Sequence, residues 1–112
     1  MDLTFDPGSA PDNIVYAVAH QPDGKVLIGG LFIRVNGTQR FRIARLNTDG
    51  STDSTFQANV GTASVGPEVY ALAVQPDGKV LVGGLFSTVN GVTRISVARL
   101  NTDGSLVTTF TS

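Results

Sequence analysis

The stretch "HQPDGKVLIGGLF", residues 20–32, recurs almost unchanged as "VQPDGKVLVGGLF", residues 74–86. The repeat extends over Val15–Phe56 and Val69–Phe110, where 29 of the 42 aligned positions are identical. Self-similarity at a fixed period is the signature of units that bury their hydrophobic faces against one another. The chain of 112 residues is therefore expected to consist of two similar units side by side.

Each unit is predicted to hold four short strands. β-Branched and aromatic residues dominate it, and no apolar stripe recurs at helical spacing. The tight turns have the composition of hairpins, because Gln-Pro-Asp-Gly-Lys and Asn-Thr-Asp-Gly-Ser supply proline, aspartate and glycine where turns need them. In the first unit the expected strands are Val15–Gln21, Val26–Phe32, Arg42–Asn47 and Ser51–Phe56.

The strands are apolar on consecutive positions instead of alternating. Val15–Ala19 contains no polar side chain apart from the tyrosine hydroxyl, which is typical of sheets that are buried on both faces. Four antiparallel strands covered on both sides and repeated without helices are typical of a β-propeller blade. We therefore expect an all-β fold, a β-propeller segment over residues 1–112, with two four-stranded antiparallel blades at 14–56 and 68–110. Met1–Phe5 aligns with Thr52–Phe56 and is expected to form an extra N-terminal outer strand, 1–5.

The motifs of the unit resemble those of the delta-60 repeat, a bacterial tandem repeat of long surface-associated proteins. The matching features are the Gln-Pro-Asp-Gly-Lys turn, the Gly-Gly-Leu-Phe segment, Val-Asn-Gly, the Ala-Arg-Leu strand, and Asp-Gly-Ser followed by Thr-Phe. The resemblance covers almost the whole chain and implies a propeller-like fold. It also implies a bacterial cell-surface or secreted parent protein, and it brings no catalytic residues with it.

Two blades are too few to close a propeller, which needs about four to eight. An unclosed pair leaves apolar blade faces uncovered, and large exposed apolar faces favour association. The expected partner is therefore the chain itself, in a cyclic homo-oligomer completed head to tail. A trimer or tetramer is favoured because it gives six or eight blades, and a dimer remains an alternative.

Composition excludes several classes of function. The net charge is −1, whereas nucleic-acid surfaces need clustered positive charge. The longest apolar run is too short to cross a bilayer, so no membrane partner is expected and the chain is soluble as written. Cysteine is absent, which excludes disulfides and thiolate metal sites, and no cofactor is predicted.

The candidate ligand site lies in the first unit's long connection. Arg34, Arg40, Phe41 and Arg42 bring three cations and an aromatic ring together, which suits an anion or a sugar. The competing interpretation is structural, because Arg40 recurs as Arg94 and is then a loop anchor. Long connections carry ligand sites more often than tight turns do, so the long-loop face is the expected ligand face.

Little in the sequence supports catalysis. His20 is the single histidine, no nucleophile is set beside it by spacing, and Asn47–Asp53 is better explained as a hairpin turn than as a calcium loop. The repeated Arg45 and Arg99 are expected to pair with a carboxylate or with backbone carbonyls between blades. The predicted function is a non-enzymatic structural or interaction module. The alternative is a lectin-like propeller that binds a glycan or an anion on its long-loop face.

Overall fold

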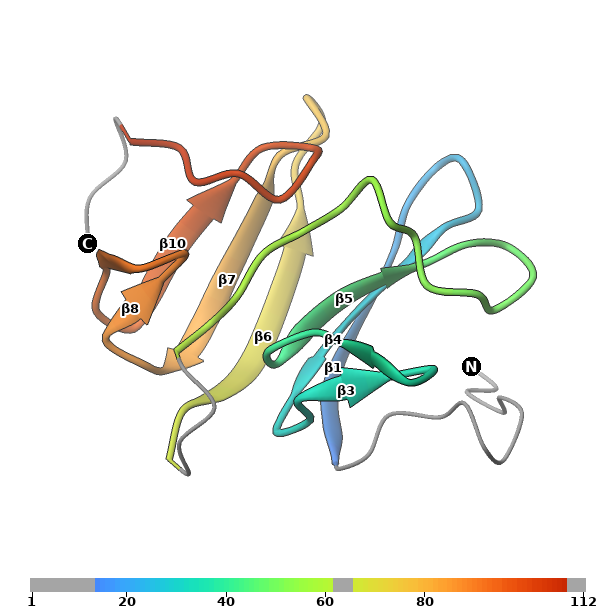
Figure 1. Ribbon diagram of the computed structural model, residues 1–112. Helices are drawn as coiled ribbons and strands as arrows, with labels where there is room; N and C mark the ends of the chain where they lie inside the picture. Colours follow the sequence, from blue (N-terminus) through green and yellow to red (C-terminus); the bar gives the residue numbers. More distant parts are fainter. Residues whose placement is uncertain (1–13, 62–65, 109–112) are drawn as a thin grey trace.

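The computed structural model describes residues 14–61 and 66–108. Over these ranges the chain forms antiparallel strands and no helix (Figure 1). The first unit contains β1 (Val15–His20), β2 (Val26–Gly30), β3 (Arg34–Val35), β4 (Thr38–Gln39) and β5 (Ile43–Leu46). The second contains β6 (Glu68–Val74), β7 (Val80–Leu85), β8 (Thr88–Val89), β9 (Val92–Thr93) and β10 (Val97–Leu100).

Each unit builds one three-stranded sheet, ordered β1-β2-β5 in the first and β6-β7-β10 in the second. Three of the four predicted strands per unit therefore exist, ending within two residues of the expected positions in the first unit. The first hairpin closes as its sequence predicts. Gly24 adopts φ 90°, a value glycine reaches without steric cost, and the Lys25 amide donates to the Asp23 side chain over 3.0 Å.

The fourth predicted strand, Ser51–Phe56, is reduced to a single bridge between Leu46 and Thr52. The reason is local, because Asp53 accepts hydrogen bonds from the Thr55 amide (2.9 Å) and hydroxyl (2.5 Å). This turn competes with strand pairing. The second unit likewise keeps only a bridge from Leu100 to Leu106. Residues 109–110 and the predicted outer strand Met1–Phe5 lie outside the described residues.

The long connection between the second and third predicted strands contains a miniature hairpin that the sequence did not predict. β3 pairs with β4, and β8 with β9, around Asn-Gly turns. Asn36 takes φ 52° at the turn, and its side-chain amide donates to the Gly50 carbonyl and the Thr52 hydroxyl, both over 3.0 Å. The hairpin is thus fastened to the end of its own sheet.

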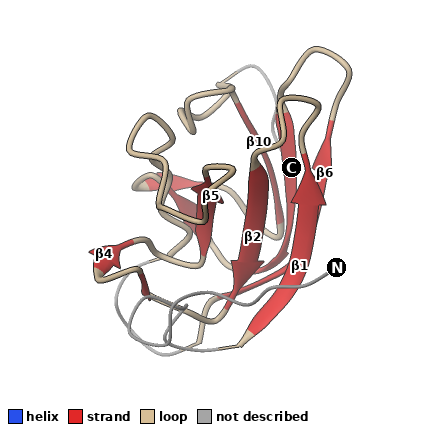
Figure 2. Cartoon of the chain, turned by 90° about the vertical axis from the view of Figure 1, so that its right-hand side faces the viewer, coloured by secondary structure: helices blue, strands red, loops and turns tan. Residues whose placement is uncertain are grey.

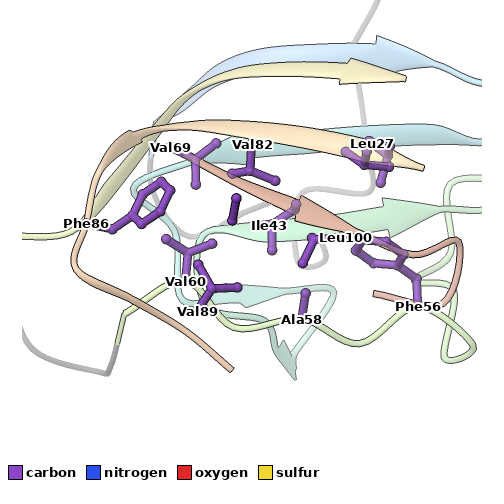
Figure 3. Close-up of a cluster of buried hydrophobic side chains, with 12 residues drawn as sticks. Leu27, Ile43, Phe56, Ala58, Val60, Val69, Val82, Phe86, Val89 and Leu100 are labelled. Atoms are coloured by element: carbon purple, nitrogen blue, oxygen red, sulfur yellow. The ribbon is translucent and has the colours of Figure 1, made fainter. Parts of the chain in front are cut away.

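The two sheets pack face to face, with β6 against β1 and β2 (Figures 1 and 2). Between them lies a core drawn from both units (Figure 3). The first unit supplies one sheet face and the segment that leads into the second unit, and the second unit supplies its facing strands. The fully buried members in Figure 3 include Leu27, Ile43, Phe56, Val60, Val69, Val82, Val89 and Leu100.

The opposite faces of the two sheets differ in what covers them. In the first unit Ile28, Phe32, Val35 and Ala44 form a second cluster and are fully buried. We define the outer face as the side of the second sheet that points away from the first unit. It carries Ala71 and Ala73 of β6, Leu81, Gly83 and Leu85 of β7, and Val97 and Arg99 of β10, so it is apolar apart from one arginine. This outer face is exposed or only half-buried throughout.

Candidate functional site

The four predicted ligand residues do not form one exposed cluster. Arg40 is only 9% exposed, and its Nη1 donates to the Gln39 carbonyl over 2.8 Å. Arg42 is 3% exposed, and its Nη1 donates to the Val60 carbonyl over 3.0 Å. Burial lowers the pKa of the Arg42 guanidinium from its ordinary value. Arg34 is exposed and Phe41 half-buried, so the anion or sugar role of this set stays a prediction.

The contact that Arg40 makes recurs in the second unit. Arg94, the counterpart of Arg40, makes the same bond to the carbonyl of its preceding residue, Thr93, over 2.7 Å. Arg42 and its counterpart Ser96 share a left-handed φ of 67° despite different side chains. The backbone path is therefore common to both units, and the contact of Arg40 is structural.

A buried ion network connects the two units. Arg45, 8% exposed, donates Nε to Asp53 Oδ2 over 2.8 Å and Nη1 to the Thr102 carbonyl over 2.6 Å. Lys25 donates to the same Asp53 oxygen over 2.9 Å. The Arg45 guanidinium also lies 5.0 Å from the centre of the Phe56 ring, within cation–π range. The prediction that Arg45 pairs with a carboxylate or with backbone carbonyls between blades is confirmed, and Arg45 makes both contacts.

The charge state of Asp53 follows from this network. Burial alone would raise the pKa of its carboxyl, but hydrogen bonds from Lys25, Thr55 and Arg45 outweigh burial and hold that pKa well below its usual range. Asp53 is therefore ionised at every pH at which the protein is normally handled. It pairs with Lys25 and Arg45, which both belong to the first unit.

A cleft of about 520 Å³ opens at the tight-turn end of the molecule, between the first hairpin turns of the two units. Its lining includes His20, Gln21 and Pro22 of the first unit, the equivalent Val74, Gln75 and Pro76 of the second, and Arg45 and Thr102. Gln21 Oε1 is buried there without a hydrogen-bond partner among the described residues. The sequence predicted the ligand face at the long connections. The cleft lies at the opposite end of the molecule.

The tyrosines form a pair that the sequence did not reveal. Tyr16 and Tyr70 stand at equivalent β-bulges at the start of β1 and β6, with ring centroids 5.2 Å apart and ring planes tilted by 55°. They are 46% and 49% exposed. The Tyr70 hydroxyl donates to Glu68 Oε2 over 2.9 Å, and this hydrogen bond raises the pKa of Tyr70. The only available signal was that both tyrosines occupy the same position of the repeat.

The described part of the chain places no three His, Asp or Glu side chains so that they could hold a metal ion. Within the same ranges no helix has the length and apolar character needed to cross a membrane.

Comparison with known proteins is informative at the level of the family. A search of the curated proteins found no match, and neither did a search of the solved structures. The model of the family described as "Domain of unknown function (DUF5122) beta-propeller" matches residues 21–56 and again residues 75–110. These matches coincide with the two units of the internal repeat and together cover more than half of the chain. The chain belongs to the DUF5122 beta-propeller family, whose function is unknown.

Proposed function

We propose that the chain is a non-enzymatic structural and interaction module, a pair of propeller blades that associates with copies of itself to complete a closed ring. The family match, the antiparallel sheets and the face-to-face packing of two like units support a propeller segment. The absence of cysteine, the single histidine and an Asp53 locked in an ion network give catalysis little to work with.

Side chains at equivalent positions of the two units differ in their exposure to solvent, and this difference is the main support for the proposal. Ile43 is fully buried beneath the second sheet, whereas its counterpart Val97 is 39% exposed. The same holds along the next strand, where Leu27 is fully buried and Leu81 half-buried. Every outer-face residue is more exposed than its counterpart in the first unit. An apolar sheet face of this kind is normally an interaction site.

In a closed ring, one type of contact between neighbouring chains covers the outer face of every chain. Identical chains that join head to tail form a closed cycle when the rotation between them permits it. Three or four chains would give six or eight blades, which are common propeller sizes, and two would give four. A trimer or tetramer is the favoured assembly.

The test is the mass of the chain in solution, by light scattering and native mass spectrometry. We expect one species whose mass is a small multiple of 11.7 kDa, with no further growth as concentration rises. A folded species of 11.7 kDa at the highest soluble concentration would refute self-association.

A matched pair of variants separates a specific face from general stickiness. Val97→Lys on the outer face should reduce the mass to that of a single chain. Val92→Lys should not, although Val92 is similarly exposed at 42%. Val92 lies in the β8–β9 hairpin, and its counterpart Thr38 remains exposed in the first unit, where the neighbouring unit is present.

The tyrosine pair supports a second candidate, a lectin-like ligand site. Half-exposed aromatic rings stack on apolar faces of ligands such as sugars, and the nearby Glu68 carboxylate is an acceptor for hydroxyls. The pair lies at the starts of β1 and β6. Because the chain has two tyrosines and no tryptophan, its tyrosine emission comes from this pair alone.

A glycan panel read by tyrosine emission tests this candidate. Specific binding should give a saturable change in emission, and Tyr16→Ala should abolish the binding measured independently by calorimetry. Arg34→Ala on the exposed part of the long connection distinguishes anion binding from stacking. A panel without a saturable response removes the candidate.

A further inference from the structure

We infer that strand β1 of a second copy docks over Gly83, in the same way that β6 docks over Gly29 within the chain. The inference rests on the proposed self-association and specifies which surfaces meet. It follows from the packing between the two units, which provides a template for the missing contact.

In the template, a side chain of one unit fills the space that a glycine leaves in the other. A Cβ placed on Gly29 would lie 2.5 Å from Val69 Cγ1 and 3.2 Å from Leu72 Cδ1. Both distances are shorter than ordinary van der Waals contact, so Val69 occupies the position where any other residue would have its side chain. Val69 itself is fully buried. Glycine in a strand interior often marks such a close approach.

The same hole is open in the second unit. Among the described residues, a Cβ placed on Gly83 would meet only atoms of its own unit, Ala71 Cβ and the Ser96 carbonyl oxygen, both at 3.9 Å. Val97 pairs with Gly83 across the sheet and is 39% exposed beside it. The hole and its apolar rim therefore repeat the geometry of Gly29 and Ile43 without a neighbour.

The matching side chains stand on β1. Val15 and Val18 are the counterparts of Val69 and Leu72, and in the single chain they are only partly buried. Residues of one chain thus supply both halves of the contact, with β1 at one end and β7 at the other. A contact between two different surfaces is heterologous, and it generates a ring when it closes.

Disulfide trapping tests the contact, and the cysteine-free chain gives no background. In the template, the Cβ placed on Gly29 lies 3.2 Å from Val69 Cβ, within a few tenths of an ångström of the roughly 3.5–4.5 Å of disulfides. Mixing the Val15→Cys and Gly83→Cys chains should give a covalent dimer under mild oxidation. Replacing the second with Thr93→Cys, on the exposed β9, should not.

The outcomes separate the inference from the proposed function. If the chain oligomerises but Val15→Cys and Gly83→Cys do not cross-link, the inference is wrong while self-association stands. If the chain does not oligomerise, both are wrong. Efficient cross-linking of the Thr93→Cys control would also overturn the inference, because it would show that the contact is not specific.

A complementation experiment provides an independent measurement without cysteines. Gly83→Val should lower the association constant by about tenfold or more, because it fills a close-packed contact. Val15→Glu should do the same by burying a charge. An equimolar mixture should form a dimer that stops growing, since each variant keeps the half that the other lacks. A mixture that stays monomeric, with both variants folded by circular dichroism, would overturn the head-to-tail contact.

Discussion

The two units have nearly the same sequence but different surroundings. Leu27 and Leu81 occupy the same position on the same strand, yet the first is fully buried and the second half-buried. Val69 occupies the space beside Gly29, whereas within residues 14–61 and 66–108 no atom of the other unit lies within 4 Å of a Cβ placed on Gly83. Burial here is decided by the neighbour and not by the residue. A repeat unit is therefore only as stable as the contact at each of its faces.

The units also differ in their polar contacts. Asp53 joins Lys25 and Arg45 in the first unit, but its counterpart in the second is Val107, a buried apolar residue. Lys79, the counterpart of Lys25, turns instead to the exposed Asp77 of its own turn, at 3.4 Å. The charge network is thus found in the first unit, which is followed by the second unit in the chain, and the carboxylate of Asp53 has no equivalent in the second unit.

The largest difference should come from truncating the equivalent leucines. Leu27→Ala should lower the free energy of unfolding by about 3–4 kcal/mol, and Leu81→Ala by about 1 kcal/mol, because only the first opens a cavity. Urea titration at a dilution where the chain is monomeric provides the measurement. At concentrations where copies associate, the Leu81→Ala cost should rise. Equal costs at every concentration would contradict the comparison.

Removing the carboxylate of the network should cost nearly as much. Asp53→Ala leaves the buried Arg45 without its ion-pair partner and should lower the free energy of unfolding by about 3 kcal/mol. Asp49→Ala is the control, since Asp49 is exposed and its hydrogen bonds in the described part of the chain lie within its own turn, with Ser51. A large loss from the control and a small one from Asp53→Ala would show that the network is not what holds the units together.

Replacing the two equivalent glycines with valine should show a smaller difference in stability between the units. Gly29→Val should destabilise the single chain by about 2 kcal/mol through collision with Val69. Gly83→Val should leave the single chain nearly unchanged, because a Cβ there meets only ordinary contacts. Thermal unfolding of both variants checks this, and a similar loss from both would exclude Gly83 as an open hole.

The smallest effect should appear in acid. The pKa of Asp53 is lower in the folded state than in the unfolded chain, where it is about 3.9. Its contribution to stability is therefore complete above that value and is lost as the pH falls below it. Asp53→Asn should give a shallower decline in unfolding free energy between about pH 5 and pH 2. Asp49 and Asp103, whose pKa values are also lowered by hydrogen bonds from serine, leave the same background slope in both proteins.

The sequence predicted what depends on neighbouring residues. The three strands of each sheet and the Asp-Gly turns follow from local composition, as does the positive φ of Gly24. It missed what depends on contacts across many residues. The β3–β4 hairpin relies on Asn36 reaching Gly50, and the shortened fourth strand on the turn that Asp53 makes with Thr55.

In the candidate sites, too, the sequence predicted what depends on nearby residues and missed what depends on distant contacts. Composition identified Arg40 and Arg42 as a cationic cluster, but could not foresee that their guanidinium groups would turn toward backbone carbonyls. Tyr16 and Tyr70 are 54 positions apart and meet only because the units stack. Arg45 was assigned correctly because an arginine that recurs mid-strand in every unit has to be neutralised wherever two sheets meet.

The hydrogen bond from Arg45 to the Thr102 carbonyl, 57 residues further along the chain, has a consequence for how the molecule melts. Loss of the second unit would remove the Thr102 acceptor from the buried Arg45, although Asp53 would remain, and it would uncover Leu27 and Ile43. Neither half can therefore come apart by itself at low cost. Heating should produce a single calorimetric transition with equal van't Hoff and calorimetric enthalpies, in spite of the modular sequence.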